Sequence, residues 1–369
     1  MIESDAAVLH GPGEPLTIET VQVEPPRSGE ALVEIAASGL CHTDTTTFDG
    51  KSASCVYPAI LGHEGAGRIV EVGPDVSDLR NGDHVIPLYS PECRKCKMCL
   101  SGRTTICRSI KATRDQGVMP DGTSRFKIDG ETVHHFMGTS TFSRYTVVPE
   151  IALAKIDPQI PFDIACLFGC GVTTGVGAAI KHVNPEDNVV VFGLGGIGVN
   201  VVQGARLAGA GKIIGVDPNE AKKAMAQRVG MTDFINAKIG EQEVVEAVKD
   251  VTGGGGDIVF ECTGLVDVMS QSLECCHVGW GTSVIIGVEP TGSQVAIAPV
   301  LLRYGRSMKG SYFGDIRSRS ELGRLINMYK DGRLEVESLI THRLSLSEIN
   351  RGFDMMASGE SLRSVVLLE

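Results

Sequence analysis

The stretch Val189-Val190-Val191-Phe192-Gly193-Leu194-Gly195-Gly196-Ile197-Gly198 joins an apolar run directly to a glycine-rich turn. The pattern Gly-x-Gly-x-x-Gly is weak evidence alone, but here it follows a predicted strand and opens a predicted helix over 196–208. A second apolar run ends at Asp217, 19 residues beyond Gly198. This arrangement is typical of a dinucleotide-binding βα unit. The alternative is a glycine-rich turn of another α/β protein.

Each glycine of this turn has a physical role in a dinucleotide-binding unit. Gly193 allows the tight turn, Gly195 lets the backbone approach the pyrophosphate, and Gly198 lets the helix pack on the strand. The helix that opens at Gly196 presents free N–H groups to the phosphates. Asp217 would accept hydrogen bonds from the adenosine ribose and repel a 2′-phosphate, so we expect NAD rather than NADP as the cofactor.

The apolar runs predict two kinds of domain. From about residue 172, runs of four to six apolar residues alternate with helical segments, which favours an α/β Rossmann domain with a doubly wound, six-stranded parallel sheet. The expected strands are 189–192, 212–216, 233–235, 257–260, 283–288 and 308–311. The N-terminal third is β-rich, as at 31–35 and 68–72, and predicts an antiparallel, partly barrelled domain with few helices. We expect the C-terminal segment, with helices at 320–330 and 347–356 and a strand at 364–368, to return to that first domain.

Net charge, the N-terminal sequence and the cysteine count disfavour several classes of function. The chain has 369 residues and a formal net charge of −11, which disfavours nucleic acid and anionic membranes as partners. Residues 1–10 lack the basic and apolar regions of a signal peptide, and no apolar run reaches the length of a membrane span. Eleven cysteines without a secretion signal favour metal ligation in a reducing cytoplasm over a disulfide framework.

Four cysteines lie within one short segment. Cys93, Cys96 and Cys99 are spaced Cys-x-x-Cys-x-x-Cys, and Cys107 follows after seven residues. Four thiolates close a tetrahedral site, so we expect a structural zinc ion here. The alternative is an iron–sulfur cluster, but in that motif the fourth Cys follows after three residues and precedes Pro, whereas Cys107 precedes Arg108.

Three residues far apart in the sequence form a second candidate metal set. Cys41, His63 and Cys170 make a Cys₂His combination, which is a known catalytic zinc arrangement with a fourth position open for water or substrate. The alternative is that these are unrelated core residues, because isolated cysteines are usually buried as small hydrophobic groups.

Taken together, these motifs give a family resemblance over essentially the whole chain. The segments 41–44, 62–67, 93–107 and 169–175 resemble those of the zinc-containing medium-chain alcohol dehydrogenases. The segments 86–89, 119–126 and 137–143 resemble the class III branch, the glutathione-dependent formaldehyde dehydrogenases. The resemblance implies a GroES-like catalytic domain formed by 1–171 and 313–369, with the NAD-binding domain at 172–312.

The resemblance also implies roles for individual residues. Cys41, His63 and Cys170 would hold the catalytic zinc, with Glu64 behind it and Asp44 bonded to the free nitrogen of His63. His42 and Arg363 would contact the NAD pyrophosphate. Lys222 would lie near the adenosine ribose, and Thr174 against the nicotinamide. Thr43 would pass on the substrate proton. Many relatives end this relay with a His, where this chain has Thr46, so we expect water to take the proton.

The implied activity is reversible hydride transfer between a primary alcohol or aldehyde and NAD. Class III enzymes oxidise S-(hydroxymethyl)glutathione, in formaldehyde detoxification, and reduce S-nitrosoglutathione. In this chain Ser52 and Ser54 replace the expected acidic residues, and Lys111 replaces the expected Arg. We therefore expect a preference for free primary alcohols, because Lys gives a point charge instead of a bidentate fork.

Three further interpretations remain. A zinc-free NAD(P)H-binding relative or a non-enzymatic protein on the same fold is one alternative function, although all three ligands of the catalytic zinc are present. A redox sensor using the adjacent pair Cys275 and Cys276 is another. The resemblance also implies a homodimer or homotetramer, for which the apolar segment 298–310 would pair across a two-fold axis.

The two ligand sets lead to a prediction about metal content. Elemental analysis of the purified protein should give about two zinc ions per chain, one for each set. Cys170→Ser should remove activity and leave the fold intact, because it changes only the open site. Iron at a stoichiometric level would contradict the zinc assignment of the four-cysteine segment.

Overall fold

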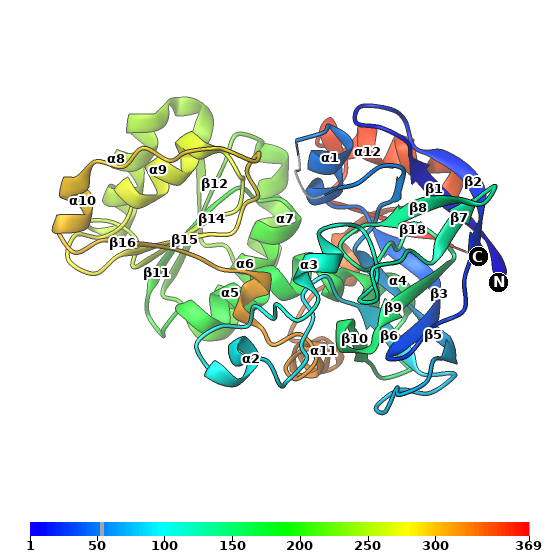
Figure 1. The fold of residues 1–369 in the computed structure, drawn as a ribbon. Helices are drawn as coiled ribbons and strands as arrows, with labels where there is room; N and C mark the ends of the chain where they lie inside the picture. Colours follow the sequence, from blue (N-terminus) through cyan, green and yellow to red (C-terminus); the bar gives the residue numbers. More distant parts are fainter. Residues whose placement is uncertain (52–54, 369) are drawn as a thin grey trace. The chain divides into compact units, whose positions relative to one another are not determined.

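The computed structural model describes residues 1–51 and 55–368 (Figure 1). The chain forms two compact units. The first comprises Met1–Cys170, Arg317–Asp331 and Val336–Glu369, and the second comprises Gly171–Ile316 and Gly332–Glu335. The boundaries expected from the sequence were 171/172 and 312/313.

A six-stranded parallel sheet forms the centre of the second unit, as predicted. Its strand order is β13 (Asp233–Asn236), β12 (Lys212–Asp217), β11 (Asn188–Phe192), β14 (Ile258–Glu261), β15 (Thr282–Ile285) and β16 (Ser307–Gly310). The strand order reverses between β11 and β14. In an open α/β sheet, ligands bind outside the carboxyl ends of the strands at such a point.

Helices cover both faces of this sheet. They are α5 (Gly171–His182), α6 (Gly196–Ala208), α7 (Lys223–Arg228), α8 (Glu241–Thr252), α9 (Val266–Glu274) and α10 (Pro299–Arg303). Figure 1 shows α8 and α9 on one side of the sheet and α5 and α6 on the other. The helix α6 has the predicted bounds. The strand expected to reach residue 288 ends at Ile285, after which the backbone N–H groups of Ile286 and Gly287 both donate to the oxygen of Glu261.

The first unit contains a barrel and a larger sheet. The closed barrel consists of β1 (Ile2–Leu9), β2 (Thr17–Val23), β7 (Phe126–Ile128), β8 (Glu131–His135) and β4 (Ala59–Ile60). The seven-stranded sheet runs β10 (Leu153–Lys155), β6 (His84–Pro87), β5 (Glu64–Val72), β3 (Glu30–Gly39), β18 (Arg363–Leu367) and β17 (Ile340–Ser345), and β9 (Tyr145–Pro149) also pairs with β3. Most strand pairs of this unit are antiparallel, as expected, whereas β4 pairs with β8 and β17 with β18 in parallel.

Short helices punctuate this unit. They are α1 (His42–Phe48), α2 (Lys97–Ser101), α3 (Lys111–Arg114), α4 (Phe162–Ala165), α11 (Leu322–Lys330) and α12 (Ile349–Ala357). The helix α1 was not predicted, because four of its seven residues are Thr, which is a poor helix former. Among the described residues no single helix is long and apolar enough to cross a membrane. The bent pair Phe162–Gly169 and Gly171–His182 reaches that length and composition only when both helices are counted together.

A buried ion pair fastens the barrel to the larger sheet. Arg125 is fully buried and donates to both carboxylate oxygens of Glu30, at 2.9 and 2.7 Å. The same guanidinium donates to Asp121 at 2.8 Å. Because the pair is buried, removing one partner would leave an uncompensated charge inside the protein and destabilise the fold.

We predict that Arg125→Met lowers the free energy of unfolding by about 3–5 kcal/mol, the usual cost of breaking a buried pair. The matched control is Arg351→Met, since Arg351 pairs with Glu348 on the surface and such pairs contribute at most about 1 kcal/mol. Urea unfolding of the zinc-loaded protein measures both changes. Equal effects of the two substitutions would show that the Arg125 pair has no special structural role.

Candidate active site and metal centres

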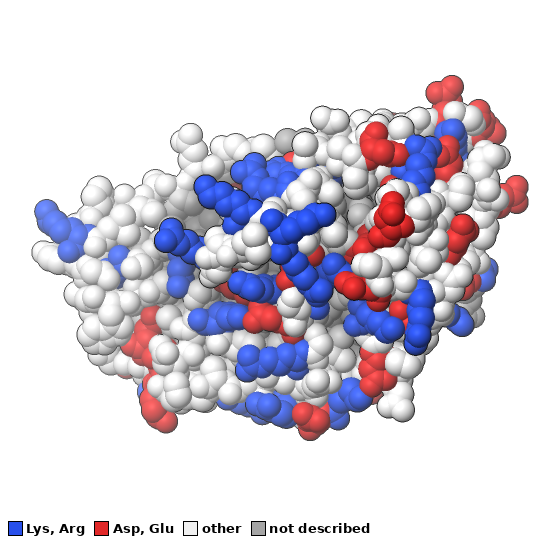
Figure 2. Space-filling view, turned by 60° about the horizontal axis from the view of Figure 1, so that its bottom comes forward, with Lys and Arg blue, Asp and Glu red and all other residues white. Residues whose placement is uncertain are grey.

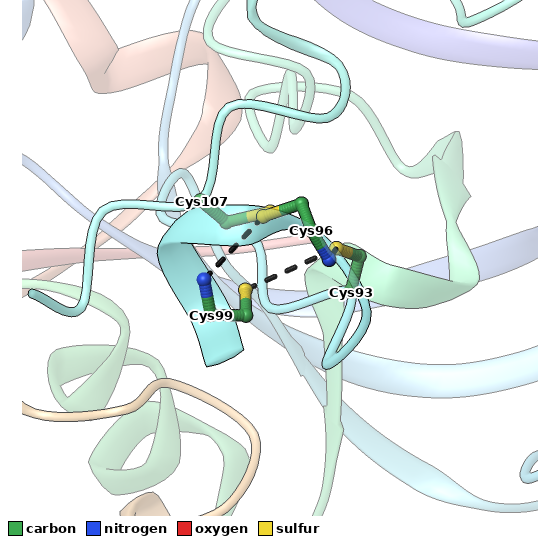
Figure 3. A group of neighbouring side chains, drawn as sticks. All are labelled: Cys93, Cys96, Cys99 and Cys107. Carbon is green, nitrogen blue, oxygen red and sulfur yellow. Dashed lines mark hydrogen bonds between the residues drawn. The ribbon is translucent and has the colours of Figure 1, made fainter. Parts of the chain in front are cut away.

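The four cysteines of the short segment converge on one point. The Sγ atoms of Cys93 and Cys99 are 3.9 Å apart, and those of Cys96 and Cys107 are also 3.9 Å apart. Figure 3 shows the four side chains facing one another. A tetrahedral zinc ion with Zn–S bonds of about 2.3 Å needs sulfur atoms about 3.8 Å apart. The four thiols therefore fit a structural zinc ion.

Backbone N–H groups prepare the thiolates of this site. The N–H of Cys96 points to the sulfur of Cys93 at 3.3 Å, and that of Cys99 to the sulfur of Cys96 at 3.4 Å. The backbone N–H of Cys99 is the main cause that lowers the pKa of Cys96 to about 6. A thiol with a lowered pKa is deprotonated near neutral pH, which is the form that binds a metal.

The zinc lobe, defined here as residues 93–114, carries a positive charge in an acidic chain. It contains no acidic residue and seven basic ones, namely Arg94, Lys95, Lys97, Arg103, Arg108, Lys111 and Arg114. Figure 2 shows a face of the molecule on which Lys and Arg side chains gather. Glu92, just before the lobe, is buried and accepts hydrogen bonds from the backbone N–H groups of Arg319 and Ser320. This contact fastens the lobe to the start of α11.

The residues predicted to hold the catalytic zinc also come together. Ligand atoms of Cys41, His63, Glu64 and Cys170 all lie within 4.8 Å of one another and are buried. Cys41 immediately precedes α1, Glu64 opens β5, and Cys170 follows the 3₁₀ helix Cys166–Gly169. Two thiols and one imidazole at this spacing fit a zinc ion with a further position available.

Asp44 orients the histidine of this set. It is fully buried, and its Oδ1 lies 3.1 Å from Nδ1 of His63 and accepts the backbone N–H of Gly62 at 3.2 Å. Its Oδ2 accepts the backbone N–H of Cys41 at 3.2 Å. Because Nδ1 of His63 is occupied, Nε2 is left to bind the metal.

The pKa values of both Asp44 and His63 are shifted from their usual values. Burial opposes the charged form of His63, but Asp44 and Cys41 outweigh it and raise the pKa of the imidazole well above its usual value. Burial also raises the pKa of Asp44, against the opposing effect of His63. The two shifts reflect the close contact of the side chains, in which Nδ1 of His63 lies 3.1 Å from Oδ1 of Asp44.

Glu64 and Arg363 form a second buried pair that the sequence did not reveal. Nη2 of Arg363 donates to Oε2 of Glu64, and both side chains are buried. Burial is the main cause that raises the pKa of Glu64 to about 8, and Arg363 opposes it. Oε1 of Glu64 has no hydrogen-bond partner among the described residues. An oxygen of Glu64 lies close enough to the other ligands to approach a metal, as the resemblance implied.

Two aromatic rings pack against His63. Tyr89 and Phe136 meet its ring edge-on, with centroid distances of 5.5 and 6.2 Å. Tyr89 lies in the segment 86–89, which supported the class III resemblance, and Phe136 directly precedes the segment 137–143. They form an apolar wall beside the metal ligands, which excludes water and strengthens the electrostatic interactions there.

The residues proposed for proton transfer lie on α1. His42 is exposed at the first helical position, and Thr43 is partly buried beside it. The hydroxyl of Thr46 donates to the backbone oxygen of His42 at 3.0 Å. The first turns of α1 therefore hold this hydroxyl in place.

The glycine-rich turn has the backbone geometry that a pyrophosphate site needs. Gly193 has φ +85°, and a Cβ on Gly198 would lie 1.8 Å from the oxygen of Gly193. By contrast, a Cβ on Gly195 would meet no atom within 4 Å. The space beside Gly195 is therefore open to a ligand, and α6 begins at Gly196 with its N–H groups directed there.

Asp217 and Lys222 lie together at the carboxyl end of β12. Oδ2 of Asp217 accepts the backbone N–H of Leu194 at 2.8 Å and the ammonium of Lys222 at 2.9 Å. A cavity of about 500 Å³ opens beside them, lined by Pro218, Asn219, Glu220, Ala221, Asn236 and Lys238. The place and charge of Asp217 fit recognition of a ribose without a 2′-phosphate. Thr174 lies on α5, where its hydroxyl is buried and has no hydrogen-bond partner within the described chain.

Glu261 is a buried acid that the sequence analysis missed. It ends β14, directly opposite Phe192 at the end of β11. Its Oε1 accepts the backbone N–H groups of Thr263 and Gly264 at 2.6 and 3.0 Å. A Cβ on Gly193 would lie 2.7 Å from the methyl group of Thr263, so this loop supports the glycine-rich turn.

The three residues expected to disfavour a glutathione adduct are Ser52, Ser54 and Lys111. Ser52 and Ser54 lie outside the described residues. Lys111 is described, and its ammonium binds Asp115, which Arg114 also contacts.

Cys275 and Cys276 are fully buried, and burial raises the pKa of these thiols, that of Cys275 to about 12. Such thiols are inert, which argues against a redox sensor.

Comparisons with known proteins agree with this geometry. Residues 27–161 match the family described as "Alcohol dehydrogenase GroES-like domain", and residues 196–331 match "Zinc-binding dehydrogenase". The chain is 54% identical to an S-(hydroxymethyl)glutathione dehydrogenase from Paracoccus denitrificans, over 98% of this chain and 99% of the relative. It is 53% identical to an alcohol dehydrogenase class-3 from Cereibacter sphaeroides, over 98% and 99%.

A solved structure supports the same assignment. An alcohol dehydrogenase zinc-binding domain protein from Burkholderia ambifaria superposes with a TM-score of 0.93 at 33% identity, over 100% of this chain and 99% of that one. The cofactors of the family, zinc and NAD, match the two cysteine-containing sets and the glycine-rich turn described above. The chain therefore belongs to the zinc-containing alcohol dehydrogenases, in their class III branch, and is an NAD-dependent dehydrogenase.

Proposed function

We propose that this enzyme oxidises small primary alcohols and reduces the corresponding aldehydes with NAD, and that it prefers the free alcohol to a glutathione adduct. The observation that carries the chemistry is the convergence of Cys41, His63 and Cys170, with Glu64 beside them. Bound zinc would supply a Lewis acid that lowers the pKa of a hydroxyl group. The remaining roles belong to the side chains of this protein.

The residues around the metal ligands hold the substrate hydroxyl and guide its proton. Asp44 keeps His63 in the tautomer that presents Nε2. Tyr89 and Phe136 keep the surroundings of that ring apolar. Thr43 would accept the substrate proton and pass it on. Because Thr46 cannot act as a base near neutral pH, we propose that water receives the proton.

Different residues would bind the adenosine ribose, the pyrophosphate and the nicotinamide of NAD. Asp217 and Lys222 would hold the adenosine ribose, and the turn at Gly193, Gly195, Gly196 and Gly198 would hold the pyrophosphate. His42 and Arg363 would contact the pyrophosphate, and Thr174 would lie against the nicotinamide. Geometry within the second unit supports the first two roles, namely the open space beside Gly195 and the buried carboxylate of Asp217.

The charge at Lys111 supports the preference for a free alcohol. Its ammonium is paired with Asp115, and Arg114 donates to the same carboxylate and to the backbone oxygen of Tyr89. The basic groups at this place are therefore already engaged within the protein. A glutathione carboxylate would have to compete with Asp115 for them, and it would gain only a point charge from Lys111.

S-(hydroxymethyl)glutathione is the second candidate substrate. The observation that favours it is the name of the relative that shares 54% of its residues with this chain. The segments that supported the class III resemblance are intact, so other residues of the chain could hold the adduct. The two candidates share one chemistry and differ only in what binds the rest of the substrate.

We predict that kcat/KM for S-(hydroxymethyl)glutathione falls below that for the best free primary alcohol. Each charge-assisted contact to glutathione that Ser52, Ser54 and Lys111 fail to make would contribute about 1.5–3 kcal/mol. The loss of two such contacts would lower kcat/KM for the adduct by roughly 10²-fold or more. The measurement is NAD reduction with the two substrates in competition. The combined change Ser52→Asp, Ser54→Glu and Lys111→Arg should raise activity on the adduct and leave the free alcohol unaffected.

The control for this experiment is Lys97→Arg, which alters a basic residue on the exposed surface of α2. It should change neither substrate's kcat/KM. A wild-type value for the adduct above that for every free alcohol would establish the second candidate and reject the first.

We infer that the enzyme works in the cytoplasm, because all eleven cysteines are free thiols and a reducing compartment keeps them so.

We also propose that it is a homodimer or homotetramer. The strand β16 pairs with β15 alone in the described part of the chain, which leaves one edge of the sheet open. Val300, Leu302 and Tyr304, just before it, are exposed apolar residues. An open edge beside such residues suits pairing with a second copy.

We predict that light scattering finds a dimer or tetramer at working concentration and that Leu302→Glu shifts it toward monomer, because the new charge would be buried in the interface. Val70→Glu is the control, since Val70 is similarly exposed but lies in the first unit, away from the segment 298–310. A monomeric wild type would refute the proposed assembly.

A further inference from the structure

We propose that Thr139 and Thr141 are positioning residues for the zinc ligand His63. Their side chains hold Gly62, the residue before this ligand, and so set where the imidazole enters the metal site. The inference concerns the metal centre and does not depend on which alcohol is the substrate.

The segment 137–143 reads Met-Gly-Thr-Ser-Thr-Phe-Ser and was singled out by the class III resemblance without a physical reason. Its four hydroxyl residues, Thr139, Ser140, Thr141 and Ser143, are all fully buried. Burying a hydroxyl is costly unless it forms a hydrogen bond. Four buried hydroxyl groups within five residues therefore need hydrogen-bond partners that explain their burial.

The hydrogen bonds of this segment converge on the chain just before His63. The backbone oxygen of Gly62 accepts the N–H of Thr141 at 3.0 Å and faces the hydroxyl of Thr139 at 3.1 Å. The Thr139 hydroxyl is shared with the backbone oxygen of Phe136 at 3.2 Å. The N–H of Phe142 donates to the oxygen of Leu61 at 3.1 Å. The two residues before His63 are thus fixed by one loop.

Close packing adds a second restraint. Gly62 has φ +89°, and a Cβ there would lie 2.7 Å from the hydroxyl oxygen of Thr141. A Cβ on Gly65 would lie 2.4 Å from the methyl group of the same residue. The side chain of Thr141 is therefore wedged against the two glycines that flank the pair His63 and Glu64. A hydrogen bond of 2.6 Å to the hydroxyl of Ser38 on β3 holds the wedge in place.

The loop also reaches His63 from the side of its ring. Phe136, which meets the imidazole edge-on, donates its backbone N–H to the hydroxyl of Ser140 at 2.8 Å. Met137 and Ser140 have φ of +54° and +48°, a conformation that non-glycine residues rarely adopt. Such strained residues persist where the surroundings enforce them, and they cluster at functional sites. The same loop therefore restrains the ligand's backbone and its ring.

A purely structural role is the alternative. If the hydroxyls only stabilise the buried loop, removing one should lower thermal stability and leave the metal geometry unchanged. If they position His63, the geometry and retention of the catalytic metal should change at temperatures where the protein is fully folded. Partners of metal-ligating histidines typically affect metal affinity by about 10–100-fold.

The test uses Thr139→Val and Thr141→Val in the full-length enzyme, with Thr139→Ser as the variant that keeps the hydroxyl. Two readouts are measured, the visible spectrum after cobalt replaces the catalytic zinc and the rate at which a chelator removes that zinc. We expect both Val variants to shift the cobalt bands and to lose the catalytic zinc at least tenfold faster, with the four-cysteine zinc retained. Thr139→Ser should behave as wild type.

The matched control is Ser272→Ala, which removes a fully buried hydroxyl bonded to Ser283 at 2.6 Å in the other unit. It should leave the spectrum and the zinc loss unchanged. Cobalt spectra and zinc-loss rates of both Val variants within twofold of wild type would overturn the proposal, even if their melting temperatures fall. If Thr141→Val does not fold, the comparison of Thr139→Val with Thr139→Ser decides alone.

Discussion

The carboxylate of Asp44 is the constraint on which the metal centre depends. It lies in the first turn of α1 and is bonded to the backbone of Cys41, the backbone of Gly62 and the ring of His63. These contacts bring two of the three ligands into one frame, although they come from separate segments. A fully buried carboxylate is costly, and here each oxygen has a partner that offsets the cost. Removing Asp44 would therefore misplace both ligand segments together.

The charges around this frame explain why the centre needs a cation. Cys41, Cys170, Asp44 and Glu64 are potential anions, and Arg363 is the permanent cation beside them. Burial raises the pKa of Asp44 and Glu64, and the bond to Cys41 raises that of Cys170, so the buried site disfavours several negative charges at once. A divalent ion would balance such charges, and the thiols would lose their protons when they bind it. Metal binding and proton release are then one event, as expected for a buried thiolate site.

The sequence predicted the parts of this protein that depend on local spacing. The four-cysteine site, the glycine-rich turn and the helix α6 follow from residues close together in the chain, and the structure has them where they were expected. Features that depend on tertiary contact were not predictable. Arg363 and Glu64 are 299 residues apart, and Thr139 and Gly62 are 77 apart. The helix α1 was missed because its Thr-rich sequence has little intrinsic helix preference, and the hydrogen bonds of Asp44 to the chain around it supply what that preference lacks.

Arg363 has an expected role in cofactor binding and an observed contact with the acid beside the metal ligands. The resemblance assigned it to the NAD pyrophosphate, whereas the structure shows it buried against Glu64. The two roles are compatible in principle, because a guanidinium has five N–H donors and the bond to Glu64 engages Nη2. Within the first unit, the contact acts on the acid itself, because burial raises the pKa of Glu64 to about 8 and Arg363 opposes that rise. Arg363 therefore favours the charged form of a carboxylate whose oxygen lies within 4.8 Å of the ligand atoms of Cys41, His63 and Cys170.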